Sequence, residues 1–560
     1  MALNGSGVIR RTPEDEDADK QQTATNFLNE SWKQWPNEAG FDGLEEHRGP
    51  LPLTIKGTIP TWAAGALYRT GPGLSKVEDT AMGTYYVSHW FDGFAHTHKF
   101  DIIADPDAST ASVTYSSRRQ SDDFVAHIKK TGWRSSISFA QCADPCVGLF
   151  AKAKSVFEPR HLNNSVTVHL DPPGFPSKSP LEGRKVFIGT DNTSVVEVHP
   201  DTLEPIGEAT QHSLHKDLGG PLSCAHAQRD PETGDVFNFN LELGKSPVYR
   251  IFRVNAESGT TDILATVTEP EVAAGYIHSF FLTENYVVLC VPSSHYSIKG
   301  LRIVWERNLV DAMLPFDESK PCQWIVVDRR HSQGVVARFT TPPGFFFHSV
   351  NAFEEQTRDE DGNVCTDINL DYVGYDTPDI ILSYYYDVIL DRNDATKKHW
   401  IDNEQYKKTN PHLVRYRYRV SPQTDPCDAQ QVLSIPNPHV GELPTINAAY
   451  ACRPYRYVYS TPSRGLSTAL DCIAKTDLRT REAVLWRGPQ GHSPGEPVFV
   501  ARPDARDEDD GVLLSVVLDG SAQRSYLLCL DARTMEEMGR AEADFAIGMG
   551  FHGSHASASR

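Results

Sequence analysis

The amino-acid sequence predicts an all-β fold in which many short strands close into a β-propeller. Short runs of β-branched and aromatic residues recur from about residue 50 to the end, between turn-forming residues. The 39 glycines and 37 prolines are spread along the chain, as many turns require. Long amphipathic helices are scarce. A ring of small sheets leaves so many strands with only short, protected edges.

The strand-like runs give the expected elements in chain order. They cover residues 111–118 (ASVTYSSR), 165–170, 185–190, 194–200, 235–240, 286–291, 322–329, 379–390 (DIILSYYYDVIL), 412–420, 455–460, 496–503, 511–519 and 525–532. No clear repeat of the WD40 or kelch type accompanies them, so the pattern alone leaves the number of blades open.

Composition narrows the class of protein. The 560 residues are 39% hydrophobic, with enough apolar material for a large core. A net charge of -20 argues against a nucleic-acid partner. No run approaches the apolar length of a spanning helix, and no apolar segment opens the chain, so we expect a cytoplasmic protein with reduced cysteines. Residues 1–25 are polar and are expected to be disordered, and residues 26–560 to form one domain.

Four of the 21 histidines stand apart from the others. His226, His278, His348 and His552 lie among apolar or small residues, in LSCAHAQ, GYIHSFFL, GFFFHSVNAF and GMGFHGSH, and no charged residue adjoins them. Taken singly, each is explained as a core histidine. A propeller can bring all four to its axis, where neutral imidazoles suit iron(II), copper or zinc better than magnesium or calcium.

Metal-bound histidines usually donate their second N–H to a carboxylate or a carbonyl. Glu442 in VGELPTIN, Glu496 in PGEPVFV and Asp191 in FIGTDNTSVV have the apolar surroundings expected of such partners. Without further information, each of the three is better explained as a turn or edge residue.

Several motifs together identify a family. The blocks GTIPTWAAGALYRTGPG and SHWFDGFAHTHKFD near the start, and GEPVFVARPDARDEDDGVLLSVVLD with SYLLCLDARTMEEMGRAE and GFHG near the end, resemble the carotenoid cleavage oxygenases from about Gly57 onward. EDDG, ADPC and GELPTIN are similar to the animal-type branch. The segment WKQWPNEAGFD is similar to its fungal members, the torulene-cleaving oxygenases of neurosporaxanthin synthesis.

The resemblance implies a seven-bladed propeller with a helical and loop cap over an axial iron(II). Four histidines hold the iron in that family, and the matching positions are His226, His278, His348 and His552. The family's outer carboxylates match Glu442 and Glu496. The third is usually glutamate, and here Asp191 stands in its place. A side chain shorter by one methylene would reach its histidine through a backbone shift or a water, or leave it to another partner.

The implied reaction is oxidative cleavage of a carotenoid, torulene first, by iron(II) and dioxygen, which converts one double bond into two carbonyl groups. A long polyene needs an aromatic tunnel. Phe346 is expected to face it from the side of His348, since alternate strand positions point oppositely, and Phe91 and Phe94 are further candidates.

Such a substrate comes from a membrane or lipid droplet, so peripheral membrane contact is expected and an obligate protein partner is not. The segment Asp144–Phe157 reads either as a helix covering the fold or as an interfacial patch with Cys146, Leu149, Phe150 and Phe157, and the resemblance favours the patch. Alternative functions are cleavage of a stilbene or another apocarotenoid, retinoid isomerisation, and a propeller that binds without catalysis.

Overall fold

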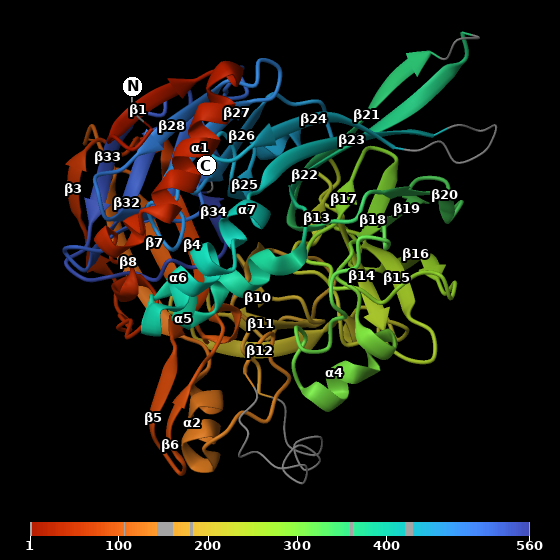
Figure 1. Ribbon diagram of the computed structural model, residues 1–560, viewed down its shortest axis with the longest axis horizontal. Coiled ribbons are helices and arrows are strands. Elements are labelled where there is room, and N and C mark those ends of the chain that lie inside the picture. Colours follow the sequence, from red (N-terminus) through yellow and green to blue (C-terminus); the bar gives the residue numbers. More distant parts are fainter. Residues whose placement is uncertain are drawn as a thin grey trace.

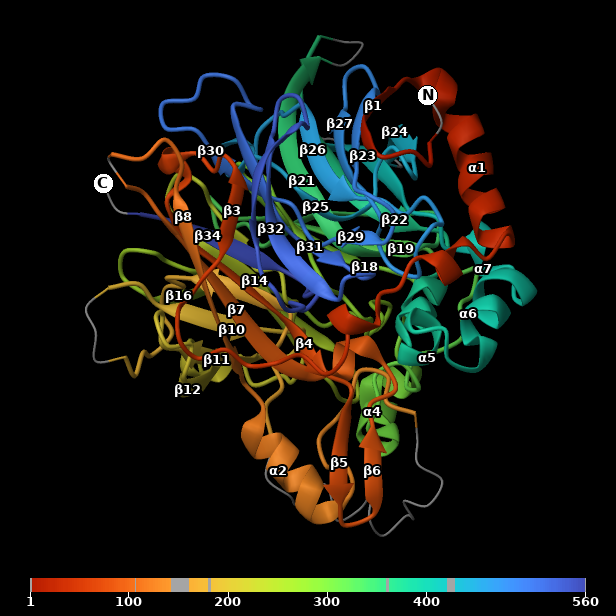
Figure 2. The same ribbon diagram turned by 90° about the vertical axis from the view of Figure 1, so that its left-hand side faces the viewer.

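The structure is a ring of β-sheets with helices over one part of it (Figures 1 and 2). It is a computed structural model that describes residues 3–105, 107–142, 161–179, 183–358, 362–420 and 429–558. Within these residues, seven sheets of four or more strands follow one another, and a two-stranded hairpin, β5 (Lys76–Thr80) with β6 (Gly83–Tyr86), stands apart. The expected seven-bladed propeller is confirmed.

Five of the blades are built almost entirely from consecutive strands. They contain β9 (Thr167–Leu170), β10 (Val186–Gly189), β11 (Ser194–Val198) and β12 (Pro205–Thr210); β13 (Gln228–Arg229), β14 (Val236–Glu242), β15 (Val248–Val254) and β16 (Thr261–Val267); β17 (Phe281–Leu282), β18 (Tyr286–Val291), β19 (Cys322–Asp328) and β20 (Val335–Thr341); β21 (Phe345–Arg358), β22 (Val364–Tyr375), β23 (His412–Val420) and β24 (Gln430–Pro436); and β25 (Glu442–Thr445), β26 (Tyr457–Thr461), β27 (Ile473–Asp477) and β28 (Ala483–Arg487).

Two blades combine the beginning and the end of the chain, and this closes the ring. One contains β2 (Leu51–Pro52), β4 (Gly65–Leu74), β7 (Phe94–Ile103), β8 (Ser112–Arg119) and the last strand, β34 (Gly553–Ser557). The other contains β29 (His492–Pro494), β30 (Val498–Ala501), β31 (Gly511–Asp519), β32 (Arg524–Asp531), β33 (Glu537–Glu542) and the early strand β3 (Thr54–Gly57). The closure joins β4 to β34 and β33 to β3.

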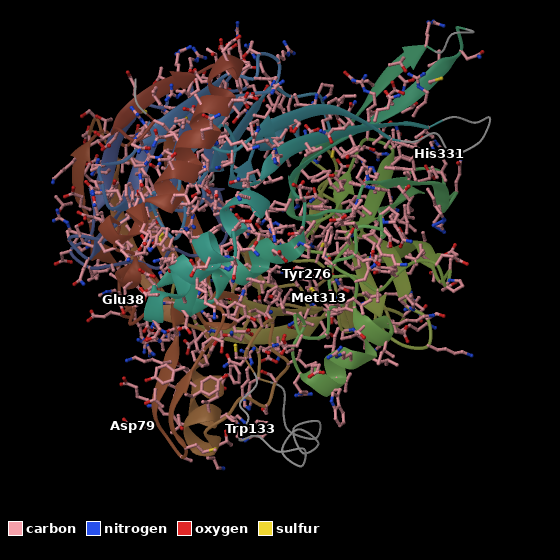
Figure 3. All side chains as sticks on the ribbon, viewed as in Figure 1. Glu38, Asp79, Trp133, Tyr276, Met313 and His331 are labelled. Atoms are coloured by element: carbon pink, nitrogen blue, oxygen red, sulfur yellow. The ribbon has the colours of Figure 1, made fainter. Side chains whose placement is uncertain are left out.

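The core lies between neighbouring sheets. Strand β31 reads GVLLSVVLD, and eight of its nine residues are buried. Such a continuous apolar run is typical of a strand covered on both faces. One face packs toward the first blade and the other toward the blade of β26 and β27. Figure 3 shows this distribution of side chains, with Tyr276 deep inside and His331 at the periphery.

Short helices between strands form the cap. They are η8 (Pro378–Tyr384), α5 (Tyr386–Ile389), η9 (Arg392–Asp394), α6 (Ala395–Lys397), η10 (Lys398–Asp402) and α7 (Gln405–Lys408) after β22, η7 (Ser297–Gly300) and α4 (Leu301–Glu306) after β18, and α2 (Asp122–Thr131) after β8.

The strand expected at residues 379–390 is wrong, because η8 and α5 occupy it. The local signals favour a helix start there. Thr377 caps the turn by accepting a hydrogen bond from the Asp379 N–H, and Pro378 occupies the first position. The apolar side chains that resemble a strand face are instead buried beneath the cap.

The disorder expected for residues 1–25 is also contradicted. Strand β1 (Gly7–Arg11) adds a fifth strand to its blade beside β28. Helix α1 (Glu16–Leu28) follows, and η2 (Ser31–Gln34) and η3 (Glu38–Gly40) lead to the first blade. The many charges of this segment indicated disorder, but charged residues also belong to its folded structure. The carboxylate of Asp19 is buried, and its Oδ2 lies 3.0 Å from Nε of Arg11. The ordered fold therefore continues through the expected boundary at residue 26.

Candidate metal centre

The four singled-out histidines meet at one point. One ligand nitrogen from each of His226, His278, His348 and His552 lies within 4.8 Å of the others. Each histidine stands on, or just before, a strand at the edge of its sheet: β13, β17, β21 and β34. The ring brings these edges together, so residues more than 300 positions apart in the chain become neighbours.

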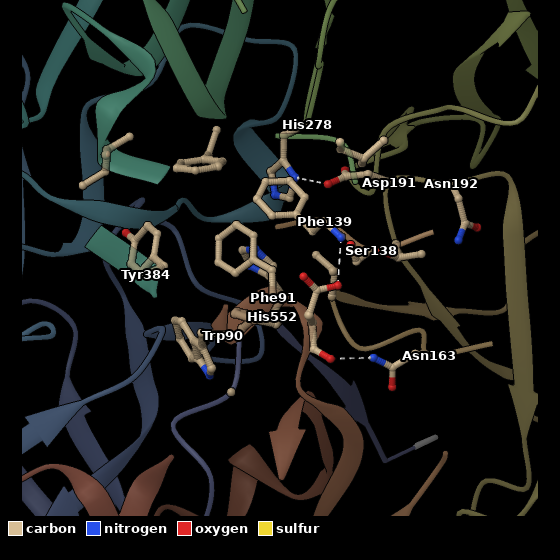
Figure 4. A pocket seen from close by; sticks show the side chains of 18 of the residues that line it. Trp90, Phe91, Ser138, Phe139, Asn163, Asp191, Asn192, His278, Tyr384 and His552 are labelled. Atoms are coloured by element: carbon tan, nitrogen blue, oxygen red, sulfur yellow. Dashed lines mark hydrogen bonds and ion pairs between the residues drawn. The ribbon is translucent and has the colours of Figure 1, made fainter. Parts of the chain in front are cut away.

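Carboxylates orient three of the four imidazoles. Nδ1 of His348 lies 2.6 Å from Oε2 of Glu442, and Nδ1 of His552 lies 2.7 Å from Oε1 of Glu496. The third contact joins His278 to Asp191 (Figure 4). A carboxylate beside Nδ1 fixes the proton on that atom and leaves a lone pair on Nε2.

Asp191 reaches its histidine directly, despite its shorter side chain. Its Oδ2 lies 2.9 Å from Nδ1 of His278 and accepts a hydrogen bond from the Tyr276 hydroxyl at 2.8 Å. Its other oxygen accepts from the backbone N–H of Ala225 at 3.0 Å. The intervening water considered from the sequence is therefore not required. His226 has no recorded contact with a carboxylate in the described part of the chain.

The imidazole nitrogens that face one another at the centre of the cluster lack enough protons to hydrogen-bond to each other. Nε2 of His348 and Nε2 of His552 are 3.1 Å apart, and both rings carry their proton on Nδ1. Nε2 of His226 lies 3.2 Å from Nε2 of His278. Two lone pairs at such a distance repel, whereas a cation among them would bind all four. The residues therefore fit a metal ion.

Burial keeps two of the imidazoles, those of His348 and His226, in the neutral form that binds metals. It lowers the pKa of His348 to about 4, against the opposing effect of Glu442. Burial, together with the other three histidines, lowers the pKa of His226 well below its usual value. Four imidazole nitrogen donors without a carboxylate ligand suit iron(II), copper or zinc.

A cavity of about 920 Å³ adjoins the histidines. His278, His348 and His552 contribute to its wall, and aromatic rings surround them. Figure 4 shows Trp90, Phe91, Phe139 and Tyr384 around His278 and His552. The volume lies in the upper part of the range of about 300–1,000 Å³ typical of small-molecule sites. The space is therefore suited to a large apolar ligand.

Of the three phenylalanines expected at a tunnel, only Phe91 lines the cavity. Phe346 packs in the core between two blades, where its ring centre is 5.8 Å from that of Phe281. The register of β21 shifts between Phe346 and Ser349, so the regular alternation assumed from the sequence fails there. Phe347 takes the place at the cavity, with its ring centre 5.6 Å from that of His278.

Phe94 is likewise placed in the core and not at the cavity. It packs in a cluster below the cap, with its ring centre 5.7 Å from that of Phe124. The expected interfacial residues Cys146, Leu149, Phe150 and Phe157 lie outside the described residues.

Two tyrosines at the site were missed in the sequence. Tyr276 donates to Asp191, and Tyr375 donates to Oε1 of Glu442 at 2.6 Å. Tyr276 precedes His278 by two residues, and this spacing could have indicated a shared side of an extended chain. No sequence signal connects Tyr375 with Glu442, since 67 residues separate them.

The sequence matches the family described as retinal pigment epithelial membrane protein (RPE65) over residues 40–557. The chain belongs to this family. Among its curated relatives, the torulene dioxygenase of Gibberella fujikuroi is 56% identical, with 99% of each chain covered. The carotenoid dioxygenase of Neurospora crassa is 49% identical over 98% of this chain and 96% of the relative. The Homo sapiens β,β-carotene 15,15'-dioxygenase is 28% identical over 91% and 92%.

Solved structures share the family fold. A cobalt-substituted Synechocystis apocarotenoid oxygenase aligns with a TM-score of 0.70 at 23% identity, covering 94% of this chain and 99% of the other. No helix in the described ranges is both long and apolar enough to cross a membrane.

Proposed function

We propose that this member of the carotenoid oxygenase family uses iron(II) and dioxygen to cleave one conjugated double bond of torulene. The observation that carries the proposal is the convergence of four imidazoles, three of them oriented by carboxylates, beside a large aromatic cavity. The names of the two fungal relatives support a carotenoid, and one of them names torulene.

Each part of the site has a role in this reaction. His226, His278, His348 and His552 would hold the iron, which when bound supplies the chemistry by which dioxygen attacks an electron-rich double bond. The reaction balances without a further reactant, because one C=C and one O=O bond are broken and two C=O bonds form. The protein holds the double bond beside the histidines and keeps water away.

The walls of the cavity are suited to that role. Phe91 lies against Phe139 and Tyr384, with ring centres 5.0 and 5.3 Å away. Phe551, directly before His552, packs against Phe91 and Trp90. Burial raises the pKa of the Tyr384 phenol far above neutral pH, so the aromatic wall carries no negative charge.

The metal ligands are tested by replacing one histidine. His278→Ala should reduce bound iron and abolish cleavage, since it removes one of four donors. The control is His555→Ala, because His555 contacts the Ala63 carbonyl at 3.1 Å and not the cluster. Iron content by elemental analysis and aldehyde formation by chromatography give the readouts. Full activity of His278→Ala would refute the proposal.

The substrate is tested by a panel. The iron-loaded protein is incubated with torulene, β-carotene and resveratrol, and the aldehydes are identified by mass. Torulene should be cleaved fastest. Cleavage of resveratrol with both carotenoids untouched would replace the proposal with the stilbene alternative, and absence of iron would favour a non-catalytic propeller.

We further propose that the mouth of the cavity rests on a lipid surface, from which an apolar substrate enters. Val304 of α4 lines the cavity and is also 51% exposed. Around it, Ile298, Leu301, Trp305 and Leu314 are exposed large apolar residues, and Ile137 from the same cavity wall is 40% exposed. Such a cluster beside a cavity mouth favours membrane contact.

Liposome flotation tests the lipid contact. Trp305→Glu should weaken binding to phosphatidylcholine vesicles, because it puts a charge into the apolar cluster. Val364→Glu is the matched control, since Val364 is equally exposed, at 60%, but lies on the outer hairpin of β21 and β22. Equal flotation of both variants and the unmodified protein would contradict the docking surface.

A further inference from the structure

Residues 3–39 lie outside the family match, yet they are an ordered part of the fold. We call residues 3–39 the N-terminal arm. Strand β1 joins the blade of β28, and α1 then runs down the outside of the ring to the cap helices, as Figure 2 shows beside α6 and α7. The arm is therefore an ordered part of the fold that the family match does not include.

The arm reaches the cavity at its helix end. Phe27, in the last turn of α1, lines the cavity together with Trp400 of η10. The two rings are stacked, with centres 4.7 Å apart and an interplanar angle of 25°. Phe27 is 4% exposed and Trp400 is 7% exposed, so both rings line the cavity from the packed interior of the protein.

Buried polar contacts fix the position of α1. Nε2 of His439 lies 3.0 Å from the Asp19 carboxylate, which also pairs with Arg11. At the other end of the helix, the side-chain amide of Asn26, next to Phe27, donates to the Arg464 carbonyl at 2.7 Å. Because a helix held at both ends has little freedom to move, the Phe27 ring is a rigid boundary.

The other side of the cavity is formed by different elements. Ile303, Val304 and Arg307, in and just after α4, line the side proposed above as the mouth. Three of the four histidines line the same continuous space. Figure 1 shows α1 and α4 at separate places on the molecule, so the cavity is lined by the arm at one place and by α4 at another.

We propose that Phe27, stacked on Trp400, is the end wall of the substrate cavity and selects which double bond is cleaved. The inference rests on the proposed function. The wall stops one end of the polyene, so its distance from the histidines determines which bond lies beside the metal. The arm is thus a specificity element outside the matched part of the family.

The test is to shorten the side chain at the wall. In Phe27→Ala the polyene should advance further, so that the cleaved bond moves away from the stopped end and the aldehyde that contains the stopped end gains carbon atoms. We expect the ratio of this longer aldehyde to the original one to rise about tenfold or more, as for other changes in pocket size. Mass analysis of both aldehydes from torulene gives the ratio.

Trp32→Ala is the matched control. Trp32 belongs to the same arm and the same aromatic cluster and is 3% exposed, but it does not line the cavity. Its loss should lower the melting temperature and leave the aldehyde ratio unchanged. Phe27→Leu, which keeps an apolar side chain, serves as a second variant if the alanine variant does not fold, and it should shift the ratio in the same direction.

The outcomes separate the two proposals. If the unmodified protein binds iron and cleaves torulene, but folded Phe27 variants give the original aldehydes in the original ratio, the end wall is refuted and the proposed function stands. If the unmodified protein cleaves no carotenoid, the proposed function fails and the end wall fails with it. An equal shift in Trp32→Ala would show a general loosening of the arm and would also refute the specific role of Phe27.

Discussion

At the scale of single residues, the ionisation of the outer carboxylates explains the geometry of the centre. Burial alone would raise the pKa of Glu442, but the adjacent His348 and the hydrogen bond from Tyr375 outweigh it and hold the pKa below its usual value. Glu496 behaves in the same way, through His552 and the guanidinium of Arg69. Both groups are therefore charged acceptors, which hold the Nδ1 protons and leave both Nε2 lone pairs facing inward.

Replacing one carboxylate should weaken metal binding without removing a ligand. In Glu442→Gln, a neutral amide replaces the anion that orients His348, so iron affinity should fall about 10- to 100-fold. Competition with a chromogenic chelator measures the affinity. Glu197→Gln is the control, because Glu197 is also buried but accepts hydrogen bonds from Ser177 and Lys178 in another blade. A similar loss of affinity in both variants would contradict the orienting role.

The residue types at the centre could be predicted from the sequence, but their contacts could not. Four histidines among small and apolar residues can be recognised in the sequence, and the family resemblance adds Glu442 and Glu496. The side of the strand on which Phe346 lies depends on a register shift in β21, and this shift cannot be recognised from the sequence. Its neighbour Phe347 therefore took the predicted place at the cavity.

At the scale of elements, β34 controls the position of the last histidine. The Gly553 N–H donates to Oε2 of Glu496 at 2.7 Å, while His552 contacts Oε1 of the same carboxylate. Arg69, buried in the neighbouring β4, donates to the carbonyls of Glu496, Met549 and Phe551. One strand pairing thus closes the ring and sets a ligand at the same time.

Gly553→Ala should test this double role. A Cβ at position 553 would lie 2.7 Å from the Tyr68 carbonyl oxygen, so β34 would have to move away from β4. We expect a loss of about 1–3 kcal/mol in stability and weaker iron binding. Thermal unfolding and iron content measure the two effects.

Gly219→Ala is the control for that substitution, because a Cβ there would meet no atom within 4 Å. If Gly553→Ala unfolds and binds iron like the unmodified protein, the tight packing of β34 has no functional consequence.

The elements differ in how far the sequence predicts them. Strands such as β31 can be predicted from the sequence, because a strand covered on both faces has a continuous run of apolar residues. Residues 379–390 have the same apolar and aromatic character but form η8 and α5. For a short apolar run, the helix-start residues Thr377 and Pro378 decide the outcome, and composition does not.

At the scale of the whole molecule, several buried histidines outside the centre make stability depend on pH. Burial lowers the pKa of His89 and His169 to about 4, and that of His96 to about 3. In the unfolded chain these groups bind protons near pH 6.5. The unfolded state therefore holds more protons below that pH, and stability falls as the pH is lowered from about 6.5 toward 4.

His96→Leu should make this pH dependence less steep. Neither ring nitrogen of His96 has a hydrogen-bond partner among the described residues, so the substitution removes a protonation cost without breaking a bond. Each tenfold change in the protonation equilibrium corresponds to about 1.4 kcal/mol. Urea unfolding at several pH values between 4 and 7.5 gives the slope.

His331→Gln is the control for that measurement, because the His331 side chain is 69% exposed. Identical slopes for His96→Leu and the unmodified protein would contradict this origin of acid instability.

The interlocking of the chain ends has a consequence for synthesis. Strands β3 and β4 are synthesised early, whereas their partners β33 and β34 are synthesised only after the strands of the other five blades. Until then the early strands carry unpaired hydrogen-bonding edges, which other nascent chains can join. Translation that stalls before β33 and β34 therefore yields open rings prone to aggregate, and the amount of folded protein in a host cell depends on how well those edges are shielded until β33 and β34 are synthesised.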